Sequence, residues 1–212
     1  MDASNQISYS EMKRKVEHIA PLAFAFTLTI FPKPIVFLLS ILAIVYGLFL
    51  SKRVVKGTLR EAEVARGFSI GKSAYGIMVL LLLILFHHRM YVVAGAWAIM
   101  ALGDGSASIF GTKWGSKKLP WNKDKSWAGL IAFIVVGTIA CTFFLWYIQA
   151  TGVIGKTINA GFSADSFREL FRIGAITALI CAIAETIRQP IDDNILVPGL
   201  AGAIIYILSK LI

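Results

Sequence analysis

Long apolar runs alternate with short charged stretches along the whole chain. A helix needs about 20 mostly apolar residues to cross the hydrocarbon core of a bilayer. By this measure the pattern predicts seven membrane-spanning helices, at 17–31, 34–50, 71–86, 90–103, 128–149, 172–188 and 195–211. The first two are separated by Pro32-Lys33-Pro34, because proline cannot continue a helix interior. The third and fourth are short for a full crossing, which leaves open a tilted pair or a re-entrant hairpin.

The composition agrees with a membrane protein. Hydrophobic residues make up 57% of the 212 residues, charged residues only 16%, and the mean hydropathy is +0.74. Soluble domains, by comparison, are about a quarter charged. We therefore expect one all-α, membrane-embedded domain over residues 1–212 and no separate soluble domain. Cys141 and Cys181 lie inside apolar runs, so we expect small core residues rather than a disulfide or a metal site.

The net charge of +9 would suggest nucleic acid as a partner of a soluble protein. In a membrane protein this charge fixes the orientation, and we expect membrane lipids, not nucleic acid, as its partner. With seven spans, the N-terminus and the loops 51–72, 104–127 and 188–194 share one face and hold 15 of the 21 lysines and arginines. That face is predicted to be cytoplasmic. The protein is thus expected to be multi-pass, in a prokaryotic plasma membrane or the endoplasmic reticulum.

The loop 104–127 carries the strongest sign of chemistry. Asp104 lies between Gly103 and Gly105 at the end of an apolar run, where an ionisable group is costly unless it is paired, solvated or bound to a metal. Five lysines follow within 13 residues: Lys113, Lys117, Lys118, Lys123 and Lys125. A carboxylate can hold Mg²⁺ while ammonium and backbone N–H groups bind phosphates, which predicts a site for a metal–nucleoside triphosphate. The alternative is a solvated basic loop of the cytoplasmic face.

Two smaller clusters fall on the same predicted face. Glu185 is followed by Asp192, Asp193 and Asn194 at the mouth of the last span, where such residues bind a metal, cap the helix, or do both. The first span opens with Lys13-Arg14-Lys15 and His18. A lone histidine near a membrane boundary is more often an interfacial residue than a catalyst. A functional role for His18 is therefore supported only by the presence of the other two clusters on the same predicted face.

Three separated elements resemble the membrane polyprenol kinase family, which includes dolichol kinases, phytol kinases and CTP-dependent diacylglycerol kinases. They are Arg14-Lys15…His18, Gly103-Asp104-Gly105…Gly111…Gly115…Pro120…Lys125-Ser126…Gly129, and Glu185…Asp192-Asp193-Asn194…Val197-Pro198. The chain is more distantly similar to the phosphatidate cytidylyltransferases. Their diagnostic tail, a glycine-rich run followed by Asp-Arg and a further Asp, is absent. The resemblance therefore favours phosphoryl transfer over nucleotidyl transfer.

The resemblance implies that the γ-phosphate of CTP is transferred to the hydroxyl of a membrane lipid alcohol. Asp104, Asp192 and Asp193 are then expected to hold Mg²⁺ or another divalent metal. Asp104 and Lys125 are expected to be catalytic, with His18 and Glu185 as candidate bases. The residues expected to bind the nucleotide are Arg14, Gly103, Gly105, Ser106, Lys113, Lys117, Lys118, Ser126 and Asn194.

Several alternatives stay open at this point. A cytidylyltransferase would form a CDP-lipid and release pyrophosphate. A small transporter would also place charges within the membrane, but nearer the bilayer midplane than these acids are expected to lie. A structural protein with a basic lipid-binding face would leave the glycine placement unexplained. The acceptor remains open among phytol, geranylgeraniol, a longer polyprenol and diacylglycerol, and the oligomeric state is not set by the sequence.

Overall fold

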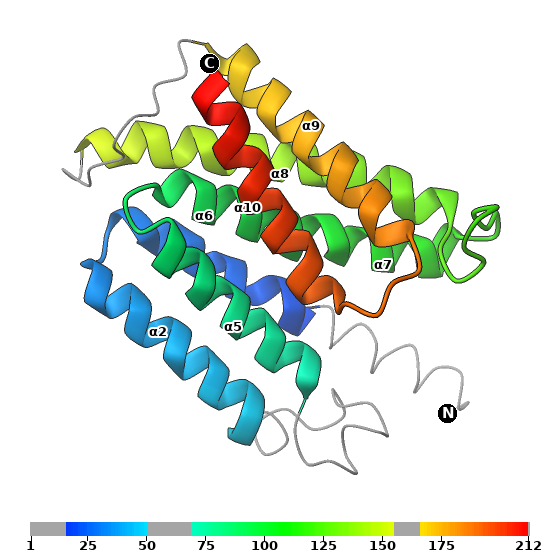
Figure 1. Ribbon diagram of the computed structural model, residues 1–212, viewed down its shortest axis with the longest axis horizontal. Coiled ribbons are helices and arrows are strands. Elements are labelled where there is room, and N and C mark those ends of the chain that lie inside the picture. Colours follow the sequence, from blue (N-terminus) through cyan, green and yellow to red (C-terminus); the bar gives the residue numbers. More distant parts are fainter. Residues whose placement is uncertain (1–15, 51–68, 155–165, 212) are drawn as a thin grey trace.

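The computed structural model describes residues 16–50, 69–154 and 166–211 (Figure 1). In this part of the chain the fold is helical and has no strand, with one isolated antiparallel bridge between Lys118 and Ser126. The elements are η1 (Ala20–Thr29), α2 (Lys33–Val45), η2 (Tyr46–Leu50), α5 (Ile70–Leu85), α6 (Met90–Ala98), η3 (Ile99–Asp104), α7 (Gly105–Trp114), α8 (Trp127–Ile154), α9 (Phe167–Thr186) and α10 (Asp193–Leu211). The predicted all-α class is confirmed for these residues.

Each apolar segment of the sequence corresponds to a helix. Among the described residues, three helices are long and apolar enough to cross a bilayer, namely Met90–Trp114, Trp127–Thr151 and Asp193–Leu211. Three shorter apolar helices of the same part of the chain cover Val16–Thr29, Lys33–Val45 and Ile70–Leu85. The number of crossings and the cytoplasmic orientation stay predictions.

The predicted loop at 104–127 is shorter than expected. α6, η3 and α7 follow one another without a break over Met90–Trp114, so Asp104 lies within a helix instead of opening a loop. The polar continuation stays helical because its small residues pack against α8. A Cβ added to Gly129 would meet the carbonyl oxygen of Ala107 at 2.8 Å. The boundary predicted at residue 104 was therefore wrong, and the connection comprises residues 115–126.

The centre of the bundle is α6, all nine residues of which are buried. Gly95 allows close packing there, since an added Cβ would lie 3.3 Å from the Cys141 sulfur of α8. α8 and α9 lie on one side of α6, α2 and α5 lie on the other, and α10 crosses in front (Figure 1). Cys141 and Cys181 are buried free thiols, which confirms the prediction of small core residues.

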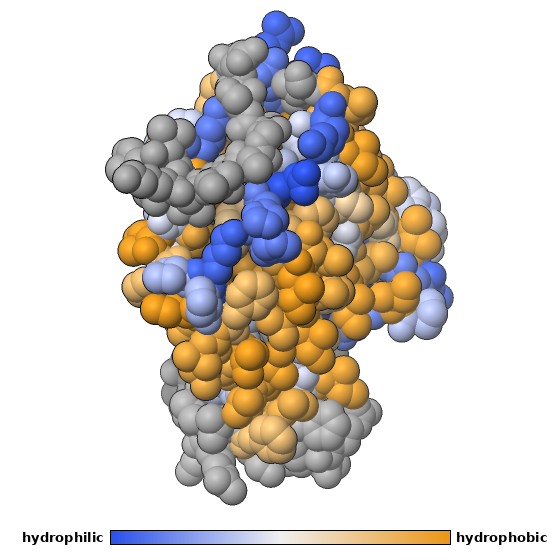
Figure 2. All heavy atoms as spheres, turned by 60° about the vertical axis from the view of Figure 1, so that its left-hand side comes forward, coloured by the Kyte–Doolittle hydropathy of each residue, from blue (hydrophilic) through white to orange (hydrophobic). Residues whose placement is uncertain are grey.

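The outer surface is apolar over wide areas. Figure 2 shows hydrophobic residues covering the middle of one face, bordered above by hydrophilic ones. The exposed large side chains include Leu38 and Ile41 of α2, Ile77 and Ile84 of α5, Ile139 and Trp146 of α8, and Leu179 and Ile183 of α9. Soluble monomers rarely expose contiguous apolar patches larger than a few hundred Å², so this surface fits the predicted contact with lipid.

Candidate active site

Three carboxylates converge where the end of α9 and the start of α10 meet the continuous helix of α6, η3 and α7. Asp104 ends η3, Glu185 lies in the last turn of α9, and Asp193 begins α10. One oxygen of each lies within 4.8 Å of the others. We refer to these three residues as the acid cluster. Its members are separated by up to 89 positions in the sequence, so the cluster exists only because the fold brings these three helices together.

Lys125 compensates part of this negative charge. Its Nζ donates to Oε1 of Glu185 at 2.5 Å and to Oδ2 of Asp193 at 3.4 Å. Burial by itself lowers the pKa of Lys125, but attraction to Glu185, and then to Asp193, outweighs burial and raises that pKa above its ordinary value. Lys125 is therefore an ammonium ion at neutral pH, and the Glu185 carboxylate, only 4% exposed, has a charged partner.

The connection 115–126 holds Lys125 in place through its own hydrogen bonds. The amide of Leu119 donates to the Lys125 carbonyl at 3.0 Å, and the amide of Lys125 donates to the Asn122 carbonyl at 3.2 Å. The side chain of Asn122 donates to the Thr186 carbonyl at 2.9 Å, which ties the connection to the end of α9. The loop that carries the lysine and the helix that carries Glu185 are thus fixed to each other.

His18 approaches the acid cluster from the first helical segment. Its Nε2 lies 3.1 Å from the carbonyl oxygen of Met100 and 3.3 Å from Oδ2 of Asp104. Both neighbours are acceptors, so the ring hydrogen belongs on Nε2. The ring also meets Tyr75 edge-on, with centroids 5.1 Å apart. In this geometry His18 orients Asp104, and its Nε2 is a hydrogen-bond donor rather than a free base.

A second polar cluster nearby was missed by the sequence analysis. Glu17 accepts a hydrogen bond from Lys72 at 2.6 Å and another from the Tyr46 hydroxyl. These contacts join the start of the first helical segment to the end of α2 and the start of α5. A signal was available, since Glu17 and Lys72 are opposite charges at the edges of two predicted spans, where an unpaired charge is costly.

Two cavities meet at this site. The long cavity, about 1090 Å³, extends from the acid cluster between η1, α2 and α5. The loop cavity, about 950 Å³, lies between α7, the connection 115–126 and the adjoining ends of α8 and α9. Lys125 and Glu185 line both cavities, together with Ser108 and Asp124. The bonded pair of Lys125 and Glu185 thus forms part of the wall between them.

The fold brings together only some of the residues predicted to form the site. His18 and Asp104 line the long cavity with Asp192, Asp193 and Asn194, and Lys113, Lys118 and Ser126 line the loop cavity. Lys117, Gly103, Gly105 and Ser106 line neither of these two cavities. Ser106 is buried and donates to the Gly103 carbonyl. Arg14 lies outside the described residues.

Two of the predicted nucleotide-binding glycines pack against other helices. A Cβ added to Gly103 would meet the Phe133 ring at 3.0 Å, and one added to Gly105 would meet Ile19 at 3.0 Å. Both glycines therefore let neighbouring elements approach Asp104 closely. Gly111 and Gly115, in contrast, do line the loop cavity.

Asp192 and Asp193 make different contacts and therefore have different roles. Oδ1 of Asp192 accepts hydrogen bonds from the backbone and side-chain amides of Asn194, both at 2.9 Å, so Asp192 caps the start of α10. Asp193 faces Lys125 and belongs to the acid cluster. The sequence had left open whether these residues cap the helix or bind a metal.

The acid cluster fits a hard divalent cation. Mg²⁺ binds oxygen ligands at about 2.0–2.1 Å, so two ligands on opposite sides of the ion are roughly 4.2 Å apart. The three carboxylate oxygens lie within 4.8 Å of one another, which needs only small side-chain movements. The ammonium group of Lys125 already contacts two of these carboxylates, so the cluster accommodates positive charge.

The amino-acid sequence of this chain is similar to those of curated phytol kinases. The probable chloroplastic phytol kinase of Zea mays is 31% identical over 170 residues, which is 76% of this chain and 52% of that protein. Phytol kinase 1, chloroplastic, of Arabidopsis thaliana is 29% identical over 159 residues, 73% of this chain and 49% of that protein. No family model and no solved structure matched.

The chain spans about half the length of the curated relatives it matches. The matched region covers most of the chain. This similarity confirms the predicted resemblance to the polyprenol and phytol kinase family.

Proposed function

We propose that this chain is a kinase that transfers the γ-phosphate of CTP to the hydroxyl of a membrane lipid alcohol. The observation that carries the proposal is the place of Lys125 and Glu185 in the wall between the two cavities. A polar donor can occupy one cavity and an acceptor with an apolar tail the other, so that their reacting atoms meet at this wall. The choice of CTP as donor rests on the family resemblance.

The loop cavity suits the donor. Lys113, Lys118 and Lys125 supply positive charge around it, and Gly111 and Gly115 leave part of its wall without side chains. Phosphoryl transfer depends mainly on positioning and on charge neutralisation. Lys125 reaches the wall between the cavities, where the γ-phosphate would lie. Lys113 and Lys118 are exposed and would bind phosphates nearer to solvent.

The acid cluster suits the metal and the acceptor hydroxyl. Asp104 and Asp193 would hold Mg²⁺, and Asp192 is assigned to helix capping instead. When bound, the metal neutralises charge on the phosphate oxygens. The acceptor oxygen bonds to the γ-phosphorus while the bond from phosphorus to the bridging oxygen of CDP breaks. The hydroxyl proton passes to Glu185, the carboxylate that lines both cavities.

The apolar outer surface is proposed to lie in the bilayer, with the acid cluster at the cytoplasmic boundary. A water-soluble nucleotide and a lipid alcohol can then reach one site from different sides. The exposed hydrophobic residues of α2, α5, α8 and α9 support this arrangement.

The deciding experiment is an assay of the purified protein in detergent with labelled CTP. Phytol, geranylgeraniol, a dolichol and a diacylglycerol are offered in parallel. We expect label from the γ-phosphate to appear in the lipid. Label from the α-phosphate would instead indicate a cytidylyltransferase, and no transfer of either label to any of the four acceptors would contradict the proposal.

Asp104→Asn removes one negative charge from the acid cluster without changing its shape. We expect turnover to fall by roughly 10²–10³-fold, the usual cost of losing an electrostatic contact in the transition state. Thermal unfolding in detergent serves as the control for folding. Retained turnover in a folded Asp104→Asn protein would show that Asp104 takes no part in the mechanism.

A further inference from the structure

The long cavity has an apolar arm that the phosphoryl-transfer chemistry leaves unused. Away from the acid cluster its walls include Pro21 and Phe24 of η1, Val36, Leu39 and Ala43 of α2, and Val79 of α5. The same cavity contains Asp104, Glu185 and Asp193 at its other end. A ligand in the arm is therefore continuous with the reacting atoms.

The polar side chains of the arm do not offer free hydrogen-bond donors to a ligand. Ser40 donates to the Val36 carbonyl at 3.2 Å, and Thr27 donates to the Phe24 carbonyl at 2.6 Å. Both hydroxyl groups are thus satisfied within their own helices. An apolar ligand in the arm would leave these donors bonded, which avoids the cost of an unpaired buried donor.

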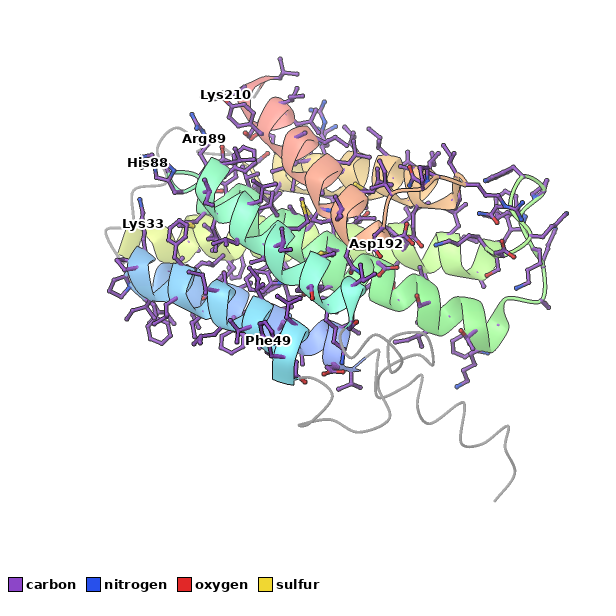
Figure 3. The ribbon with its side chains drawn as sticks, turned by 60° about the horizontal axis from the view of Figure 1, so that its bottom comes forward. Lys33, Phe49, His88, Arg89, Asp192 and Lys210 are labelled. Carbon is purple, nitrogen blue, oxygen red and sulfur yellow. The ribbon has the colours of Figure 1, made fainter. Side chains whose placement is uncertain are left out.

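The arm follows α2 for most of its length. Tyr46 lies at its polar end, bonded to Glu17, and Val36 lines it near the other end of the helix. At about 1.5 Å rise per residue, ten residues of α2 correspond to roughly 15 Å. Figure 3 shows the direction of this run, with Lys33 and Phe49 labelled at opposite ends and Asp192 beyond the Phe49 end.

α2 and α5 touch beside the arm. A Cβ added to Gly76 would lie 3.2 Å from the backbone nitrogen of Ile44, so the two helices pack directly on each other there. Residues of η1 also line the arm, so three segments enclose it.

We infer that the arm binds the hydrocarbon tail of the acceptor and that it limits the length of that tail. The inference rests on the proposed function. The hydroxyl lies at the acid cluster, the tail extends along α2, and Val36, only 4% exposed, limits the far end. Alcohols whose tails fit the length of the arm are the preferred substrates.

The test blocks the arm without touching the acid cluster. Ala43 is an exposed residue of the cavity wall, so Ala43→Trp adds bulk inside the arm. Ile41, on the same helix, is 47% exposed and does not line the cavity, so Ile41→Trp is the matched control. We measure kcat/KM for geraniol, farnesol, geranylgeraniol, phytol and a diacylglycerol.

For Ala43→Trp we expect kcat/KM for geranylgeraniol and phytol to fall by about tenfold or more, and that for geraniol to stay near the wild-type value. Ile41→Trp should match the wild type for every alcohol. Val36→Ala should shift the preference toward longer tails by roughly threefold, because it enlarges the far end. Retained geraniol turnover shows that Ala43→Trp is folded, and Leu39→Trp provides a second obstruction if it is not.

The outcomes separate the two proposals. If the wild type phosphorylates none of the alcohols, the proposed function fails and the tail site fails with it. If the wild type is active but Ala43→Trp and Leu39→Trp show the same length profile as Ile41→Trp, the tail site is wrong while the kinase activity stands.

Discussion

At one end of the bundle the acid cluster surrounds Lys125, whereas at the other end cationic side chains gather without acidic partners. Figure 3 labels three of the latter, Lys33, Arg89 and Lys210, together with His88, along the edge opposite Asp192. In the described part of the chain, no ion pair involves any of these four residues. Among the described residues, opposite charges are therefore paired at the acid cluster, whereas the labelled side chains of the other end have no acidic partner.

The cationic end is compatible with simple contact to water or lipid headgroups. Neighbouring His87 first, and then Lys33 and Arg89, lower the pKa of His88, so His88 is neutral at pH 7. The Arg89 guanidinium lies 4.9 Å from the centre of the Tyr206 ring. Exposed like charges cost little because solvent and salt screen them. The acid cluster is more buried and needs Lys125, so its charges are held together despite a cost in desolvation.

Replacing each of the two adjacent aspartates in turn tests the acidic end most strongly. We expect Asp193→Asn to lower turnover by roughly 10²-fold, because it removes charge from the acid cluster. Asp192→Asn keeps an Oδ1 acceptor for the amide of Asn194, so turnover should stay within about threefold of the wild type. The assay uses labelled CTP and one alcohol at several Mg²⁺ concentrations. Equal losses of turnover in the two variants would show that Asp192 also belongs to the metal site.

Replacing Lys125 tests whether the acidic end depends on its cation for stability. Lys125→Met leaves Glu185 buried without its charged partner, and we expect a loss of about 1–3 kcal/mol at pH 8, discounted for the partial exposure of the lysine. The double variant Lys125→Met/Glu185→Gln should recover much of this stability but not the activity. Denaturant unfolding in detergent measures the difference. An unchanged stability of Lys125→Met would contradict the pairing.

The same pair predicts a dependence on pH. Because the pKa of Lys125 is raised in the folded protein, its contribution to stability is fully present below its ordinary value of 10.5 and is lost as the pH rises through the higher folded value. The difference in stability between wild type and Lys125→Met should therefore begin to shrink only above about pH 10, near the ordinary pKa of Lys125. A difference in stability that shrinks between pH 8 and 9 would show that the predicted direction of the Lys125 pKa shift is wrong, or that another residue is responsible.

The cationic end should give the smallest effect. We expect the double variant Lys33→Ala/Lys210→Ala to keep turnover in neutral detergent within about twofold of the wild type, since exposed charges far from the acid cluster contribute little. A loss comparable to that of Asp193→Asn would mean that the two ends are coupled, and the contrast between them would fail.

Much of the fold could be predicted from the chain because apolar runs and turn residues are local signals. Topology alone also placed Asp104 on the same predicted face as Asp193, and the structure brings their carboxylates together. The end of the predicted span at residue 103 was wrong, because a hydropathy pattern does not register a helix that continues through small and polar residues when another helix covers it. The contact of Gly129 with Ala107 supplies that cover.

The roles of neighbouring residues could not be predicted in the same way. Consecutive residues on a helix differ by about 100° in direction, so which of Asp192 and Asp193 faces the cluster depends on how α10 is rotated against α9. The contacts of Glu17 with Tyr46 and Lys72 depend likewise on the packing of three separate segments. Only tertiary structure fixes these details.

The wall formed by Lys125 and Glu185 has a kinetic consequence. On the arrangement proposed, one substrate arrives by diffusion in three dimensions through water, while the other arrives by diffusion in two dimensions within a lipid layer. Adding inert lipid or detergent would then dilute the alcohol on its surface while the nucleotide concentration stays the same. We expect the apparent KM for the alcohol to follow its mole fraction in the micelle or vesicle, and that for the nucleotide to follow its bulk concentration.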